Sequence, residues 1–182
     1  MPAHTIPLFI FLFAFSPFVY CSGLLTSGPL DKDIKRASLV YLPLIDWRLY
    51  KAQLYQESHL NPLAVSHAGA KGVAQFMPGT WGEYQTAFKT TAQAFNAGHS
   101  IRAGAWYMSK MRRFWKSPRP EHDRHSLALT SYNWGAGNVN KEQKKCEGAL
   151  LYKDIAKCMK VKEAKEYAPR IWRHYLALLL GG

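Results

Sequence analysis

Residues 55–81 read YQESHLNPLAVSHAGAKGVAQFMPGTW, and this stretch sets one acidic residue directly before a loop of small residues. The acid is Glu57, and the residues from 66 to 79 are rich in glycine and alanine. Asn61-Pro62 is typical of the end of a helix. The stretch therefore predicts a helix that carries an acid and leads into a tightly turning loop.

Glu57 ends an apolar stripe on the predicted helix. Trp47, Tyr50 and Leu54 precede it at spacings that place all four side chains on one face. A carboxyl group held against such a surface loses hydration, which raises its pKa, and a general acid near neutral pH needs a raised pKa. The structural alternative is a solvated glutamate at a helix end, and the spacing alone leaves both readings open.

A second carboxylate facing Glu57 does not follow from the sequence. Thr80 and Glu83 have the spacing of a capping box, which gives Glu83 a structural role. Spacing also pairs neither Asp123 nor Glu163 with Glu57. Because glycosidases that use two carboxylates need both at one sugar ring, the pattern favours chemistry that uses one.

The periodicity of the chain favours a mainly α fold. We expect a long helix over 100–115, a connector over 116–124 and a helix over 126–133 that Gly135 stops. A last helix should have Pro169 near its start, where the missing N–H is tolerated. The 182 residues, 48% of them hydrophobic, suit one compact domain.

The N-terminal segment predicts export. Residues 1–30 contain no Asp, Glu, Lys or Arg, and small residues follow an apolar core. We read residues 1–23 as a secretory signal peptide, with an uncleaved membrane anchor as the alternative. The division expected downstream is a linker over 24–36 and a catalytic domain over 37–182.

Cys146 and Cys158 are the two cysteines outside the N-terminal segment. An even pair in an exported domain predicts a disulfide, and two buried thiols are the alternative. The chain carries no His-Glu-x-x-His or paired Cys-x-x-Cys motif. We therefore expect neither a metal nor another cofactor.

The formal net charge of +12 favours an anionic partner. Nucleic acid, anionic lipid and an acidic cell wall all fit this charge. Seven lysines between residues 141 and 162 could suggest nucleic-acid binding, but a solvated basic face is the commoner explanation. Export also disfavours DNA, so we expect no nucleic-acid partner.

Four segments of the chain resemble the soluble lytic transglycosylase (SLT) family, which is related in fold to goose-type lysozyme. They are QESHLNP (56–62), GVAQFMP (72–78), SYNWGAGN (131–138) and EAKEYAPR (163–170). The resemblance implies a single, mainly α, lysozyme-like domain with a saccharide-binding cleft. Trp134 stands where the family has a small residue, which bears on the preferred length of the glycan.

The resemblance also implies an activity and a site. The family cleaves the β-1,4 bond between N-acetylmuramic acid and N-acetylglucosamine and leaves a 1,6-anhydromuramoyl product. Glu57 matches the catalytic acid. The residues that match the family's substrate contacts are Ser58, Gln75, Tyr132, Asn133 and Tyr167. The alternatives are a hydrolytic lysozyme and a wall-binding module without activity.

The expected partner is therefore peptidoglycan, and the expected location is the periplasm. Attachment to the membrane facing the periplasm, or association with a phage, would fit the same sequence. Wall remodelling, opening the wall for a secretion or conjugation machine, and phage lysis or entry remain open as settings.

Overall fold

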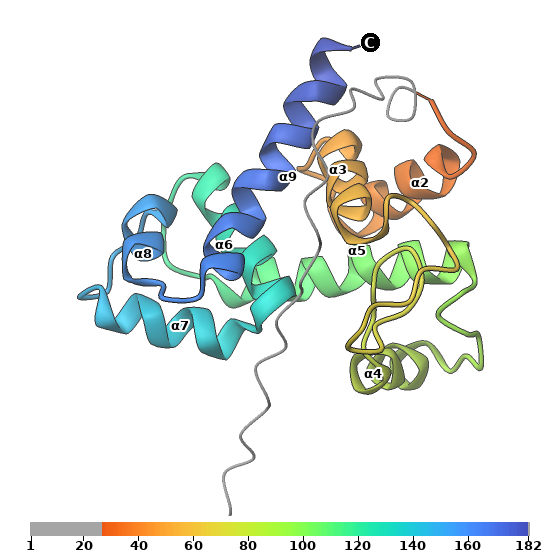
Figure 1. Ribbon diagram of the computed structural model, residues 1–182, viewed down its shortest axis with the longest axis horizontal. Coiled ribbons are helices and arrows are strands. Elements are labelled where there is room, and N and C mark those ends of the chain that lie inside the picture. The colour runs from red at the N-terminus through yellow and green to blue at the C-terminus, as the bar shows by residue number, and fades with distance from the viewer. Residues whose placement is uncertain (1–26, 182) are drawn as a thin grey trace, which may run out of the picture.

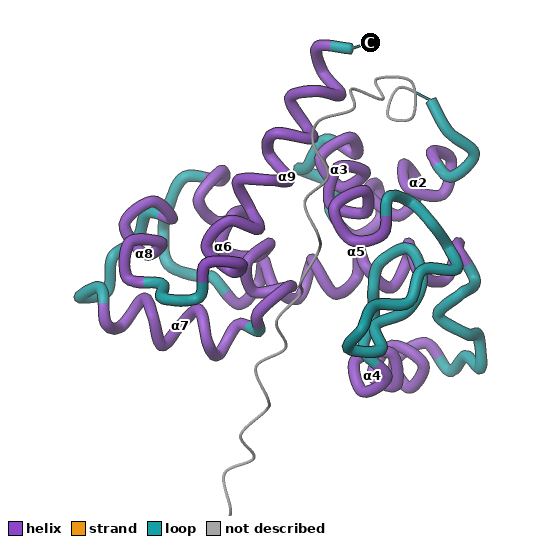
Figure 2. The backbone as a smooth tube through the Cα atoms, viewed as in Figure 1, coloured by secondary structure: helices purple, strands orange, loops and turns teal. Residues whose placement is uncertain are grey.

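Helices make up most of the chain, as the sequence predicts. The computed structural model describes residues 27–181, so the predicted signal peptide at 1–23 lies outside the described part. The helices are α2 (Asp31–Tyr41), α3 (Trp47–Ser58), α4 (Pro78–Phe88), α5 (Ala97–Phe114), α6 (Glu121–Trp134), α7 (Ala136–Lys145), α8 (Tyr152–Cys158) and α9 (Lys162–Leu180) (Figure 2). Within these residues, no helix has the length and apolar character that crossing a bilayer requires.

Helix α5 is the central element of the fold. It packs against α2 near one end and against α6 near the other, while α9 packs against both α3 and α6 (Figure 1). Ile101, Ala105 and Met108 on α5 are fully buried, so this face of the long helix lies in the core. This arrangement brings the end of α3, the loop after it and the end of α6 toward the middle of α5.

Helix α2 corrects the predicted linker. We expected a linker over 24–36, but the chain is helical from Asp31 onward. Ile34 on this helix has 0% exposure, and the ammonium group of Lys51 on α3 lies 2.7 Å from the carboxylate of Asp31. The lysine side chain also has 0% exposure, so this ion pair fastens α2 to α3 inside the protein.

Helix α4 begins without the predicted capping box. Met77 is the residue before the helix, Pro78 occupies its first turn, and no side chain caps it. Pro78 can start the helix because the N–H that proline lacks would have no partner there. Glu83 is exposed and accepts a hydrogen bond of 2.9 Å from Lys110 on α5.

Pro169 lies inside α9, not near its start as predicted. A proline within a helix leaves the carbonyl four residues earlier without its usual N–H donor. That carbonyl belongs to Lys165, and the hydroxyl of Tyr152 on α8 donates to it at 2.8 Å. A side chain from another helix thus replaces the missing bond and allows α9 to continue.

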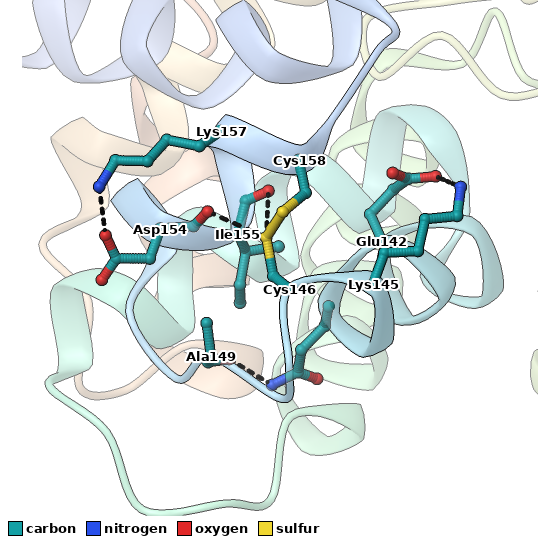
Figure 3. The surroundings of a disulfide bond; sticks show 9 residues. Glu142, Lys145, Cys146, Ala149, Asp154, Ile155, Lys157 and Cys158 are labelled. Carbon is teal, nitrogen blue, oxygen red and sulfur yellow. Dashed lines mark hydrogen bonds and ion pairs between the residues drawn. A yellow bond between two sulfur atoms is a disulfide. The ribbon is translucent and has the colours of Figure 1, made fainter.

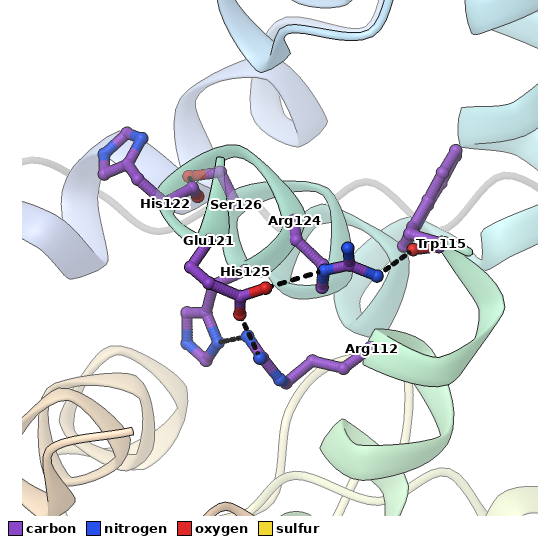
Figure 4. Close-up of polar contacts among 7 residues, drawn as sticks. All are labelled: Arg112, Trp115, Glu121, His122, Arg124, His125 and Ser126. Atoms are coloured by element: carbon purple, nitrogen blue, oxygen red, sulfur yellow. Dashed lines mark hydrogen bonds and ion pairs between the residues drawn. The ribbon is translucent and has the colours of Figure 1, made fainter. Parts of the chain in front are cut away.

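A polar network fixes the start of α6 against the end of α5. We expected the connector to reach residue 124, but α6 already begins at Glu121. The Glu121 carboxylate accepts hydrogen bonds from Arg112 at 2.6 Å and Arg124 at 3.0 Å (Figure 4). Arg124 also donates to the carbonyl of Trp115 at 2.6 Å. The network closes the connector and orients α6, whose far end carries Tyr132.

The disulfide predicted between Cys146 and Cys158 is present. Cys146 follows α7 and Cys158 ends α8, with their Cα atoms 6.0 Å apart (Figure 3). The sequence analysis did not anticipate either of these helices. The bond joins their ends beside α6, against which both helices pack.

Candidate active site

Glu57 lies in the last turn of α3 and lines a pocket. The walls of this pocket come from α3, the loop after it, α4, α5 and α6. The lining residues are Glu57, Ala70, Gln75, Phe76, Met77, Thr80, Tyr107, Tyr132 and Asn133. Glu57 is the only carboxylate among them. Four helices and one loop therefore bring a single acid to a concave surface.

Burial raises the pKa of Glu57 to about 8. Its carboxyl group is enclosed by the protein and only partly accessible from the pocket, and loss of hydration disfavours the charged form. A hydrogen bond from Tyr167 acts in the opposite direction, and the charge of Glu163 adds to the rise. Glu57 therefore carries its proton at neutral pH, as the desolvated reading of the sequence expected.

Tyr167 reaches Glu57 from α9. Its hydroxyl donates a hydrogen bond to Oε1 of Glu57, and its ring is buried. The contact spans 110 positions along the chain and depends on the close packing of α3 against α9. Tyr167 is therefore a direct partner of the acid, although it does not line the pocket.

Tyr132 and Asn133 come to the pocket from the end of α6. The hydroxyl of Tyr132 donates to the carbonyl of Ala74 at 2.7 Å, and its ring packs edge-on against Tyr107 and Phe76. Tyr132 thus holds the loop against the helices. Asn133 forms part of the wall beside it.

Gln75 is held in place by its own loop. Its backbone adopts a left-handed conformation, with a φ of 49°, and its side-chain nitrogen donates to the carbonyl of Gly72 at 2.9 Å. Isolated β-bridges pair Lys71 with Val65 and with Phe76, and they fold the loop back on itself. The loop therefore presents Gln75 to the pocket from a constrained backbone.

Ser58 is the last residue of α3 and is not among the residues that line the pocket. Only 7% of Ser58 is exposed, and its hydroxyl donates to the carbonyl of Val73 at 2.8 Å. This bond ties the end of α3 to the underside of the loop. Ser58 therefore supports the site through the backbone.

Several pocket residues were missed by the sequence analysis. Tyr107 is the most prominent, because it joins α5 to the site and its neighbour Met108 faces the core. An aromatic side chain at that position carries no signal of a site until the fold brings Tyr132 against it.

Among the described residues, no group of three or more His, Cys, Asp or Glu side chains is arranged to hold a metal.

Comparison with solved structures supports the fold. The 70 kDa soluble lytic transglycosylase from Escherichia coli aligns with a TM-score of 0.69 and 21% identity, over 84% of this chain and 24% of that one. An inactive mutant of the lytic transglycosylase Slt from Pseudomonas aeruginosa aligns with a TM-score of 0.68 and 24% identity, over 82% and 24% of the two chains. Both likenesses concern the architecture.

Sequence comparison identifies the family. The membrane-bound lytic murein transglycosylase F of Erwinia tasmaniensis is 36% identical over 115 residues, which cover 63% of this chain and 22% of that protein. The protein of the same name from Shewanella baltica is 32% identical over 127 residues, or 68% and 26% of the two chains. The matches thus span about a quarter of these curated relatives. Residues 42–154 match the Transglycosylase SLT domain, so the chain belongs to the SLT transglycosylase family.

Proposed function

We propose that this protein is a peptidoglycan lytic transglycosylase. It cleaves the β-1,4 bond between N-acetylmuramic acid and N-acetylglucosamine and leaves a 1,6-anhydro ring on the muramoyl residue. The observation that carries the proposal is the lone carboxyl group of Glu57 in the pocket, with a pKa raised to about 8. The relatives named lytic murein transglycosylases support it.

In the first step, protonated Glu57 donates its proton to the glycosidic oxygen as the bond between that oxygen and C1 breaks. A buried carboxylate then forms, which is unfavourable without a partner. Tyr167 already donates to Oε1, so it stabilises the new charge without moving. Because no second carboxylate lines the pocket, the substrate's own N-acetyl group assists at C1.

In the second step, the Glu57 carboxylate accepts the proton of the C6 hydroxyl on the same muramoyl residue. The C6 oxygen bonds to C1 as the bond between C1 and the assisting N-acetyl oxygen breaks, which closes the anhydro ring, and Glu57 regains the proton it gave up. No water is consumed. A pKa near neutrality suits a group that must act as an acid and then as a base.

The pocket walls supply the substrate contacts. Gln75, Tyr132 and Asn133 line the surface beside Glu57, so we assign them to the sugar, as the resemblance implies. Tyr107 joins this set on its position alone. Ser58 keeps a supporting role, since its hydroxyl is occupied by the loop. Because peptidoglycan is the proposed substrate, we infer that the enzyme acts in the periplasm after export.

Glu57→Gln tests the proposal. The amide has nearly the same shape but cannot donate a proton as an acid, so release of soluble muropeptides from purified peptidoglycan should fall about 1,000-fold. Chromatography with mass detection measures the release. Glu83→Gln is the matched control, because Glu83 is exposed and lies outside the pocket lining, and it should keep activity within twofold. Activity of Glu57→Gln within tenfold of wild type would remove Glu57 from the catalytic role.

A further inference from the structure

Ser100 is a buried serine in the first turn of α5. It has 0% exposure, and its hydroxyl oxygen accepts a hydrogen bond of 3.1 Å from the backbone N–H of Ala74, in the loop between α3 and α4. A buried backbone N–H is strongly unfavourable without a partner, so this bond fixes where Ala74 lies. Resting on the proposed function, we infer that Ser100 is a positioning residue that holds Gln75, the next residue of the loop, at the pocket.

Ala74 is the point at which two helices hold the loop. Its N–H is bonded to Ser100 on α5, and the hydroxyl of Tyr132 on α6 donates to its carbonyl at 2.7 Å. The loop also lies close against α5, because a Cβ atom at Gly104 would be 3.0 Å from the Cβ atom of Ala74. Both backbone polar groups of Ala74 are therefore bonded to hydroxyl groups, and the loop cannot leave α5 without breaking a bond.

The backbone of Gln75 needs such an anchor. Its φ of 49° lies in the left-handed region, which a residue other than glycine keeps only where its surroundings impose it. The N–H of Gln75 bonds to the carbonyl of Gly72 at 3.2 Å and closes a turn. Val73 and Ala74 form the middle of that turn, so the bond to Ser100 holds the turn from which Gln75 projects.

The side chain of Gln75 shows what this position provides. Its amide nitrogen donates to the carbonyls of Gly72 at 2.9 Å and Ala64 at 3.3 Å. An amide nitrogen has two N–H donors, so the loop uses both and the side-chain oxygen remains for a ligand. Because Gln75 lines the pocket, this oxygen can accept a hydrogen bond from an O–H or N–H group of the sugar. That contact is lost if the loop shifts.

Ser100 acts on substrate binding and not on the acid. It does not line the pocket, so it reaches the substrate only through the loop. The pKa of Glu57 is shifted by burial, by Tyr167 and by Glu163, and Ser100 is not among these causes. Loss of the serine hydroxyl should therefore weaken binding and leave the titration of the acid in place.

The test is Ser100→Ala, which removes the acceptor and little volume. With soluble glycan strands as substrate, we expect KM to rise about tenfold and kcat to stay within twofold, with the alkaline limb of the pH profile unchanged. Ser109→Ala is the matched control. Ser109 is also buried on α5, but its hydroxyl donates to the Trp106 carbonyl of the same helix, so KM should stay within twofold.

A double-mutant cycle with Gln75→Ala decides whether Ser100 acts through Gln75. In that background Ser100→Ala should change KM by less than about twofold, because the contact that it positions is already absent. A single variant with KM within twofold of wild type, a loss carried mainly by kcat, or a full tenfold effect in the Gln75→Ala background would each overturn the inference. Ser100→Cys, whose thiol is a weak acceptor, repeats the test if the alanine variant does not fold.

A readout without substrate separates this inference from the proposed function. NMR of wild type and Ser100→Ala reports the hydrogen exchange of the Ala74 amide, and the backbone couplings and shifts of Gln75 report its φ. The inference predicts faster exchange at Ala74 and loss of the left-handed φ at Gln75, while the amide of Leu54 within α3 exchanges as in wild type. A Gln75 backbone that is unchanged in the variant contradicts it. If wild type releases no anhydromuropeptides, the proposed function fails while this measurement still decides the role of Ser100.

Discussion

In the proposed mechanism Glu57 loses and regains a proton in each turnover, although its surroundings oppose the charge. Burial raises its pKa to about 8, and the hydrogen bond from Tyr167 limits that rise. The balance between the two keeps the acid protonated at rest and would let the carboxylate form briefly during the proposed reaction. At the scale of single residues, the proposed chemistry therefore depends on Tyr167 as well as on the acid.

The same burial predicts a stability effect with a defined sign. The folded protein keeps the Glu57 proton up to about pH 8, whereas the unfolded chain releases it near 4.5, so wild-type stability falls across this window. Glu57→Gln does not titrate. The variant should exceed wild type in free energy of unfolding by about 4 kcal/mol at pH 8, and the gap should vanish near pH 4. Urea unfolding at both pH values measures it, and a gap that does not depend on pH contradicts the buried, protonated state.

At the scale of elements, the loop between α3 and α4 depends on Gly72. Its φ is +78°, and a Cβ atom there would lie 2.0 Å from the carbonyl oxygen of Ala94. Gly72→Ala should therefore destabilise the fold by about 2–3 kcal/mol and displace Gln75, whose amide bonds to the Gly72 carbonyl. Thermal unfolding and muropeptide release should both show the loss.

Gly82 on α4 provides the matched control for the loop. A Cβ atom at Gly82 would meet nothing within 4 Å, and its backbone is helical. Gly82→Ala should leave activity unchanged and raise stability by up to about 1 kcal/mol. Equal behaviour of the two variants would show that the left-handed turn at Gly72 is not what shapes the site.

The buried ion pair between α2 and α3 gives a second prediction at this scale. Asp31→Asn leaves the ammonium of Lys51 buried without its counter-charge, so the free energy of unfolding should fall by about 3 kcal/mol. Asp33→Asn in the same turn of α2 is the control, because Asp33 is exposed and forms no ion pair with any residue that the structure describes. Its effect on the free energy of unfolding should stay below about 1 kcal/mol. Denaturant unfolding compares the two, and similar losses would show that the pair does not fasten α2.

The helices also show which parts of the fold could be predicted from the sequence and which could not. The apolar periods of α3 and α5 are strong, and both helices appear as predicted. Helix α2 was missed because part of its attachment is a lysine, a residue that usually signals a solvated surface. The prediction that Pro169 starts the last helix was wrong. Tyr152 donates the hydrogen bond that the proline removes, and because Tyr152 lies on another helix, spacing along the chain does not reveal it.

At the scale of the whole molecule, the pocket forms because the fold brings together residues that lie far apart in the sequence. The motif resemblance supplied Glu57, Gln75, Tyr132 and Asn133, which the structure gathers around one pocket. The same resemblance pointed to Tyr167, but only the packing of α9 on α3 shows it bonded to the acid. No sequence pattern marked Tyr107, since its place in the pocket depends on α5 and α6 meeting.

The central claim is that one carboxyl group serves both steps and that the substrate's own hydroxyl replaces water. Digestion of purified peptidoglycan in heavy-oxygen water, followed by mass spectrometry of the released muropeptides, tests it most directly. The account predicts 1,6-anhydromuramoyl ends that carry no solvent oxygen, because Glu57 is the only carboxylate in the pocket lining. Muramic acid ends with a reducing C1 that carries heavy oxygen would contradict it and identify a hydrolytic lysozyme on the same fold.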